Sequence, residues 1–215
     1  MFAVGHMALG YLLGKGSAKP LRVHPNVAIL MVLSIIPDID IIFGVEGFHR
    51  GPTHSVITAL LIFVPFFIFY RQRAVPYFLA LVSHGLIGDL LVGGNIQLFW
   101  PLESAHVFLP APFPVIDITS PVNVLLESSL FVIALVVLVK SWDFLSFFRG
   151  KLSYLVLIIP IFTVLLPTLT GYPLKVPLLL VPSHMFFLIL FSLAVLVSFF
   201  AMLRYSLFPS GKARG

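Results

Sequence analysis

The sequence predicts an all-α integral membrane protein with about five full spans, two short N-terminal membrane helices and a polar site at the extracytoplasmic helix ends. Of the 215 residues, 60% are apolar and only 10% are charged, whereas a soluble domain carries about a quarter charged residues. The mean hydropathy is +1.11, and several apolar stretches approach the roughly 20 residues that span a bilayer. This composition excludes a soluble globular protein and a disordered chain.

The first two apolar stretches are too short to cross a membrane. They cover Val4–Leu13 and Pro25–Ile36, and the second would reach only about 18 Å of a hydrocarbon core about 30 Å thick. Non-helical backbone at membrane depth is tolerated only against protein or a water-filled cavity. We therefore expect a recessed polar cavity at the ends of these two helices.

Five longer stretches predict the full spans. Glycine and proline residues such as Gly51-Pro52 separate them and favour turns. Residues 1–140 are expected to form the helical core that carries the site, and residues 141–215 to add two helices and a basic tail to the same membrane domain. The five predicted spans are Thr53–Tyr70, Val75–Val92, Val122–Val139, Leu152–Leu169 and Val176–Leu203.

Charged residues are distributed unevenly between the two ends of the predicted helices. If the segments alternate in direction, 11 of the 13 basic residues fall on one side, and the positive-inside rule makes that side cytoplasmic. Seven of the eight acidic residues fall on the opposite side, which indicates a cation site there. We therefore expect a plasma (inner) membrane protein with cytoplasmic basic loops, a cytoplasmic C-terminus and a site that faces outward.

Eight potential metal ligands lie near the outer ends of five predicted segments. Ionisable groups at membrane depth are costly and are functional candidates by default. Imidazole and carboxylate ligands suit zinc, with manganese or iron as alternatives, and the chain has no cysteine for a thiolate site. One tetrahedral zinc uses four ligands, so eight candidates would suit two or more ions. The eight are His6, Asp38, Asp40, His49, His54, His84, Asp89 and Glu127.

The segment His49–Ser55 places candidate histidines beside an anion site. Pro52 suits the first turn of a helix. Arg50 and the free amides of that helix N-terminus could hold a phosphate. The phosphate-binding and metal-binding groups would then lie next to each other. The alternative interpretation of this segment is a well-capped helix start with two interfacial histidines.

The five-residue spacing of His84 and Asp89 predicts a local departure from α-helical geometry. On a straight α-helix the two side chains would point about 140° apart. Facing one site requires an overwound or π-bulged turn, or two different metals. The alternative is a histidine bonded to a backbone carbonyl and a solvated aspartate.

Other polar residues have simpler interpretations. Asp38 and Asp40 follow Pro37 and could be solvated carboxylates at a helix exit, and Glu127 could reach the membrane interface. The remaining histidines have no expected role in the site. We expect His24 to be interfacial, His106 to be solvated in the outer loop, and His184 to be a satisfied core residue.

Several short motifs occur in a fixed order along the first two thirds of the chain. They are Gly5-His6, Pro37–Asp40, His49–Ser55, Ser83-His84 with Asp89, Leu98–Pro101, and a glutamate that opens the next span. Over residues 1–140 they resemble the YdjM-type family of predicted inner-membrane metal-dependent hydrolases. That family is similar, more remotely, to the zinc-dependent phospholipase C and single-strand nuclease superfamily. The resemblance implies that the eight residues above are metal ligands and that Arg50 and Thr53 face the substrate. The family usually spaces its histidine and aspartate four apart, whereas here they are five apart.

The favoured hypothesis is a metal-dependent phosphoesterase that acts on a lipid or lipid-linked phosphoester. Metal-activated water would attack, Arg50 would hold charge, and Asp40 or Glu127 could act as base. Because no soluble domain is present, membrane lipids are the expected partners, and the scattered basic residues favour no nucleic acid. Two alternatives remain: an ion- or proton-coupled transporter, disfavoured by the apolar cytoplasmic halves of the spans, and a non-catalytic metal-stabilised scaffold.

Overall fold

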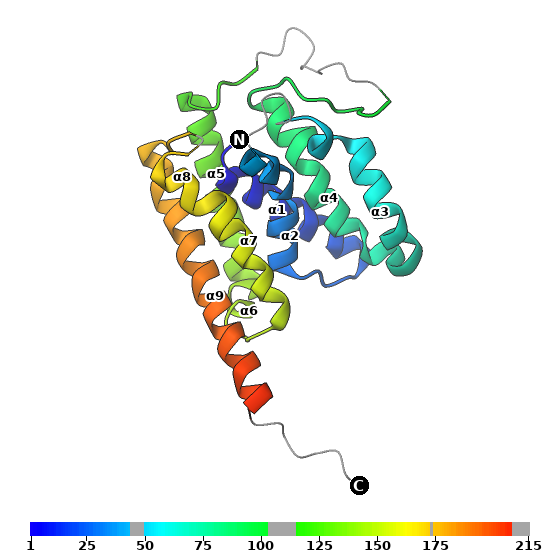
Figure 1. Cartoon of the computed structure of the whole chain (residues 1–215), viewed down its shortest axis with the longest axis vertical. Coiled ribbons are helices and arrows are strands. Elements are labelled where there is room, and N and C mark those ends of the chain that lie inside the picture. The colour runs from blue at the N-terminus through cyan, green and yellow to red at the C-terminus, as the bar shows by residue number, and fades with distance from the viewer. Residues whose placement is uncertain (44–49, 103–114, 173, 208–215) are drawn as a thin grey trace.

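The computed structural model describes residues 1–43, 50–102, 115–172 and 174–207 (Figure 1). Most of these residues are helical, and one isolated β-bridge joins Val92 and Ile116. The segments η4 and η6 are π-helices, and the other η segments are 3₁₀-helices. The elements are α1 (Ala3–Leu21), α2 (Val27–Leu33), η1 (Ile36–Phe43), η2 (Pro52–His54), α3 (Val56–Tyr70), η3 (Arg71–Arg73), α4 (Val75–Ser83), η4 (His84–Asp89), α5 (Pro121–Lys140), α6 (Asp143–Ser146), η5 (Leu152–Leu157), α7 (Ile158–Pro160), η6 (Ile161–Leu165), α8 (Leu166–Thr170), η7 (Leu178–Leu180) and α9 (Val181–Leu207).

Within the described residues, four helical stretches are long and apolar enough to cross a membrane. They are Val56–Arg73, Pro121–Lys140, Leu152–Thr170 and Leu178–Leu207. The fifth expected span, Val75–Val92, is not among them, because its continuous helix, α4 followed by the π-helix η4, ends at Leu91 and is slightly shorter than the four others. The polar site lies where this helix changes geometry.

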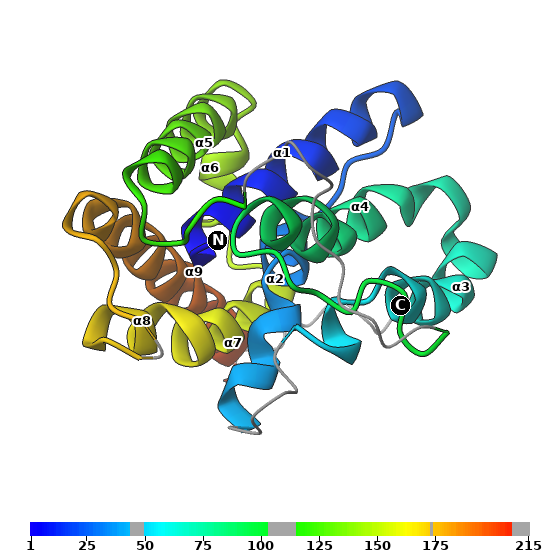
Figure 2. The same cartoon turned by 90° about the horizontal axis from the view of Figure 1, so that it is seen from above.

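Helix α1 is longer than the short helix predicted at Val4–Leu13. It has 19 residues and contains Lys15, which the sequence placed after the helix. It packs against α2, α4 and α5, and Figure 2 shows it between α4 and α5. The packing is close, since a Cβ on Gly10 would collide with Ser34 and one on Gly14 would lie 2.6 Å from Leu30 Cδ2. The prediction was wrong because small and basic residues end the apolar stretch without ending the helix.

The second short segment ends within the protein. Helix α2 has seven residues, and the side chain of Asn26 caps it by accepting hydrogen bonds from the amides of Ala28 and Ile29. The 3₁₀-helix η1 follows and carries Asp38 and Asp40, which are 8% and 5% exposed. These carboxylates are therefore recessed, as the short apolar stretch predicts, and are not the solvated helix exit that was the alternative.

Helix directions place the candidate site at one end of the bundle. In Figure 1, α5 and α9 begin and α8 ends at the end that holds the N-terminus. At the other end lies Asp143, the one acidic residue that the charge pattern assigns to the basic side. Its Oδ2 accepts a hydrogen bond from the Tyr11 hydroxyl at 2.9 Å and pairs with Lys15 Nζ at 2.7 Å. This acid thus ties α6 to α1.

Asp117 belongs to the acidic side but has a local role. It is exposed, and its Oδ1 accepts hydrogen bonds from the amide and hydroxyl of Thr119 at 2.8 and 2.6 Å. These bonds favour the charged form and hold the pKa of the Asp117 carboxyl below its ordinary value. Asp117 therefore stabilises the turn before α5.

Candidate metal centre

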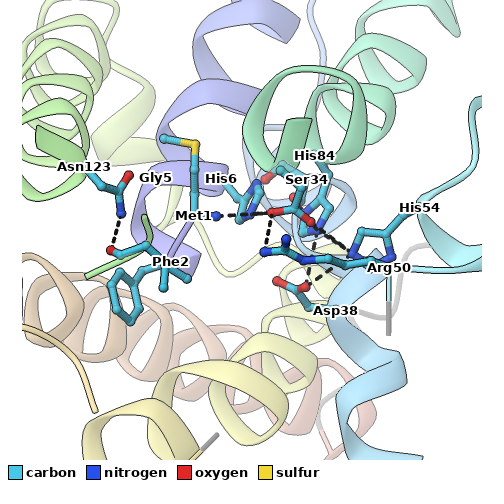
Figure 3. Close-up of polar contacts among 12 residues, drawn as sticks. Met1, Phe2, Gly5, His6, Ser34, Asp38, Arg50, His54, His84 and Asn123 are labelled. Carbon is cyan, nitrogen blue, oxygen red and sulfur yellow. Dashed lines mark hydrogen bonds and ion pairs between the residues drawn. The ribbon is translucent and has the colours of Figure 1, made fainter. Parts of the chain in front are cut away.

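Four buried side chains converge at the junction of three short helices. Asp38 comes from η1, His54 from η2, and His84 and Asp89 from η4. Each offers one ligand atom, and these atoms all lie within 4.8 Å of one another. Figure 3 shows Asp38, His54 and His84 pointing toward a common region, with Arg50 and His6 beside it.

Five of the six distances between the ligand atoms match a tetrahedral metal, and the sixth, between Asp38 and Asp89, is within 4.8 Å. For zinc bonds of 2.0–2.1 Å, neighbouring ligand atoms should be roughly 3.3 Å apart. His54 Nε2 lies 3.1 Å from His84 Nε2, 3.6 Å from Asp38 Oδ1 and 3.2 Å from Asp89 Oδ2. His84 Nε2 lies 3.3 Å from both Asp38 Oδ1 and Asp89 Oδ2. Asp89 Oδ2 is buried and has no hydrogen-bond partner among the described residues, so these four residues could hold a divalent metal.

Hydrogen bonds behind the histidines fix which nitrogen faces the cluster. His84 Nδ1 lies 2.7 Å from the carbonyl oxygen of Ser34, so Nδ1–H donates and Nε2 keeps its lone pair for the cluster. His54 Nδ1 lies 3.0 Å from Thr53 Oγ1, and that hydroxyl donates to Asp40 Oδ2 at 2.7 Å. Asp40 and Thr53 therefore lie behind His54 and orient it.

The predicted departure from α geometry between His84 and Asp89 is confirmed. Residues 84–89 form a π-helix, and this turn brings the two side chains to the same cluster. Two glycines allow neighbouring elements to approach the π-turn. A Cβ on Gly85 would lie 2.6 Å from the carbonyl oxygen of His54, and one on Gly88 would lie 2.5 Å from the His6 ring.

His6 lies against the cluster from α1. Its ring stacks on that of His84 with centroids 3.7 Å apart, and its Nε2 lies 3.3 Å from Asp89 Oδ1. Neither ring nitrogen makes a hydrogen bond within the described part of the chain. Asp89 therefore faces His6 with Oδ1, and it faces His54 and His84 with Oδ2. The predicted ligand His6 thus lies next to the four clustered residues.

Arg50 places a positive charge at the edge of the centre. Its Nη1 donates to the carbonyl oxygen of Gly94 at 2.6 Å, and its Nη2 lies 4.0 Å from Asp89 Oδ1. The side chain is 19% exposed. An anion bound at this edge would therefore meet both the guanidinium and the metal ligands.

Glu127 is occupied by the start of α1. Its Oε1 accepts hydrogen bonds from the Phe2 amide and from Asn123 Nδ2, both at 2.8 Å, and its Oε2 accepts one from the Gly5 amide at 3.2 Å. It is not one of the four grouped residues. In this arrangement Glu127 satisfies amides that a helix N-terminus leaves without partners.

We expect Glu127→Ala to destabilise the protein without removing its metal. Each buried N–H left without a partner costs about 1–3 kcal/mol, so thermal unfolding followed in detergent should occur at a lower temperature. The control is Ser129→Ala, an exposed serine on the same helix that bonds the Leu125 carbonyl. Loss of metal with unchanged stability would instead show that Glu127 is a ligand.

We expect Gly93→Ala to displace Arg50. A Cβ on Gly93 would collide with the Arg50 guanidinium, and its φ of 91° already favours glycine. For the hydrolase that is proposed below, phosphoester turnover should fall by up to about 10²-fold, while elemental analysis should find unchanged metal. The matched control is Gly171→Ala, which has a φ of 102° and open space around the added Cβ. Unchanged turnover in Gly93→Ala would argue against a role for the Arg50 position.

Other predicted residues are placed as follows. His49 and His106 lie outside the described residues. His184 is buried as predicted, and its Nδ1 lies 2.9 Å from the carbonyl oxygen of Leu180, but its Nε2 has no hydrogen-bond partner among the described residues, so this core histidine is only half satisfied. Ser34 and Gly94 were not predicted from the sequence, because they act through backbone carbonyls and leave no side-chain signal.

These observations define an integral membrane helical protein with a buried histidine–aspartate cluster able to hold a metal. The family model for YdjM inner membrane protein matches residues 1–166, and the chain belongs to this family. The match includes all four clustered residues and extends beyond residue 140. No curated protein and no solved structure matches the chain.

Proposed function

We propose that the protein is a membrane-embedded metal-dependent hydrolase that cleaves the phosphoester of a lipid or lipid-linked substrate, with its site on the outer side of the membrane. The observation that carries this proposal is the convergence of four buried candidate metal ligands, Asp38, His54, His84 and Asp89, with the Arg50 guanidinium beside them. Ligand atoms for a metal and a cation for a phosphate thus meet in one place. The apolar helices around them favour a substrate that is itself in the bilayer.

Different residues of the site would bind the metal, orient its ligands and bind the phosphate. A divalent metal, when bound, would lower the pKa of a water molecule and polarise a phosphoryl oxygen. His54 and His84 would hold it through Nε2, while Thr53, Asp40 and the Ser34 carbonyl keep these rings in place. Arg50 would neutralise the phosphate. Zinc suits this ligand set best, with manganese or iron as alternatives.

One observation favours a second candidate, a metal-stabilised membrane scaffold. Four protein ligands complete a tetrahedron, whereas catalytic zinc sites usually keep one position open. The four ligands also join η1, η2 and η4 and would hold them together. A transporter receives less support, since the buried histidines and carboxylates of the described residues gather at one end of the helices.

Turnover assays separate the two candidates. Detergent-purified protein loaded with zinc or manganese is incubated with phospholipids, polyprenyl phosphates and soluble phosphodiesters. We expect metal-dependent cleavage of a lipid phosphoester that is faster than cleavage of any soluble ester. Faster turnover of soluble esters would contradict the lipid substrate, and a metal-loaded protein that cleaves nothing would favour the scaffold.

A further inference from the structure

An apolar groove runs along the membrane helices, and one end of it comes close to the metal centre. It lies between α2 with η1 on one side and α3 with α4 on the other, and its volume is about 1080 Å³. This volume is slightly above the usual range for ligand pockets, about 300–1,000 Å³. Most of its wall is apolar, with Ile29, Leu33, Phe63 and Leu81 among the lining residues. The space would therefore suit a hydrocarbon chain.

One end of the groove lies near the metal centre, although none of the four candidate ligands lines it. Pro37 and Thr53 line this end, and they directly precede the candidate ligands Asp38 and His54 in the chain. Thr58 lines the groove nearby, and its hydroxyl oxygen is buried without a hydrogen-bond partner in the described residues. A ligand that offers an ester or hydroxyl oxygen here would satisfy it.

The groove is open sideways along α3, which is a candidate membrane span. Ile62 and Phe66 line it and are nevertheless 54% and 47% exposed. From Thr58 to Tyr70 the helix rises by about 18 Å at 1.5 Å per residue. One leaflet supplies roughly half of a hydrocarbon core of about 30 Å, so the groove is long enough for the acyl chain of one lipid.

We propose that this groove holds an acyl chain of the phospholipid whose phosphoester occupies the metal centre. The inference rests on the proposed function for its headgroup end. The opposite orientation would put an anionic headgroup at the far end, near Arg22 and Arg73. We favour the first orientation because only the near end offers a buried cluster, Arg50 and the unpaired Thr58 hydroxyl. Arg22 and Arg73 are exposed and fit the general charge bias of membrane loops.

Photo-crosslinking tests the orientation without requiring turnover. The protein is placed in phosphatidylcholine vesicles that contain phosphatidylglycerol with a diazirine on one acyl chain. A diazirine at the chain terminus should label the far half of the groove, around Phe66 and Tyr77, and one next to the ester should label the region of Thr58. The reversed pattern would overturn the orientation. Labelling of the outer face of α3, at Leu61 and Phe69, without labelling of the groove would overturn the inference.

A pair of neighbouring tryptophan substitutions tests whether the groove itself is occupied. Ile62→Trp narrows the groove, whereas Leu61→Trp adds the same bulk at a residue that is 64% exposed and does not line it. Both positions are exposed, so neither change overfills a core. Ile62→Trp should reduce labelling by the terminal diazirine about tenfold, equivalent to about 1.4 kcal/mol, and Leu61→Trp should leave it unchanged. Equal labelling of the two variants would overturn the inference.

The outcome is separable from that of the proposed function. A groove that is labelled as expected in a protein without any turnover would contradict the hydrolase and leave a lipid-binding groove. A protein that cleaves lipid phosphoesters but shows no groove labelling would keep the hydrolase and overturn this inference.

Discussion

Replacing His84 with alanine should remove nearly all bound metal from the protein. His84 Nε2 faces Asp38, His54 and Asp89 at 3.1–3.3 Å, so its loss deletes one of four converging ligand atoms. Mutating an outer partner of a metal ligand typically lowers metal affinity about 10–100-fold, and loss of the ligand itself should cost more. Elemental analysis and chelator competition on purified protein would measure this change.

Two further variants give metal affinities with which the His84→Ala result can be compared. Asp40→Asn alters the hydroxyl-linked chain behind His54 without deleting a ligand, and we expect the intermediate loss of about 10–100-fold in affinity. His184→Ala removes a buried histidine outside the cluster and should retain full metal. Full metal retention in His84→Ala would show that the cluster is a hydrogen-bonded core. Equal metal loss in His184→Ala would attribute the change to general unfolding.

The ligand types and their position at the ends of the helical segments could be predicted from the sequence. Buried carboxylates and histidines in an apolar chain are rare enough that each is a candidate, and the five-residue spacing of His84 and Asp89 already indicates a π-turn. The structure adds which candidates meet. Asp38, His54, His84 and Asp89 form one group, whereas Asp40 lies behind His54.

The remaining differences arise from contacts that a single sequence does not display. Glu127 satisfies amides of Phe2 and Gly5, more than 100 positions away in the chain, and sequence spacing carries no information about such pairing. The length of α1 was underestimated because its last turns are polar and mostly exposed or half-buried, with Lys15 paired to Asp143. Apolar periodicity detects the face of a helix that enters an apolar environment and carries no signal for polar turns that continue the helix.

Replacing Arg50 with glutamine should abolish most phosphoester turnover while leaving the metal in place. The guanidinium donates to the Gly94 carbonyl and lies 4.0 Å from Asp89, so it is held at the edge of the centre without being a ligand. Removing a preorganised group that stabilises transition-state charge costs about 10²–10³-fold in kcat. Arg50→Lys should recover only part of this loss, because an ammonium cannot bond a carbonyl and a phosphate in the same fixed geometry.

The Arg50 experiment requires a matched charge control and a metal measurement. Arg71→Gln removes an exposed arginine from η3, at the opposite end of α3 from the centre, and should leave turnover unchanged. If Arg50→Gln keeps wild-type turnover, the phosphate must be held by other groups, and the proposed role of Arg50 in phosphate binding is wrong. If the variant instead loses its metal together with its activity, Arg50 stabilises the metal centre through Asp89. The buried Asp89 carboxylate would then require the positive charge of Arg50, 4.0 Å away, to stay in place. Loss of turnover with retained metal is the result that assigns Arg50 to the substrate.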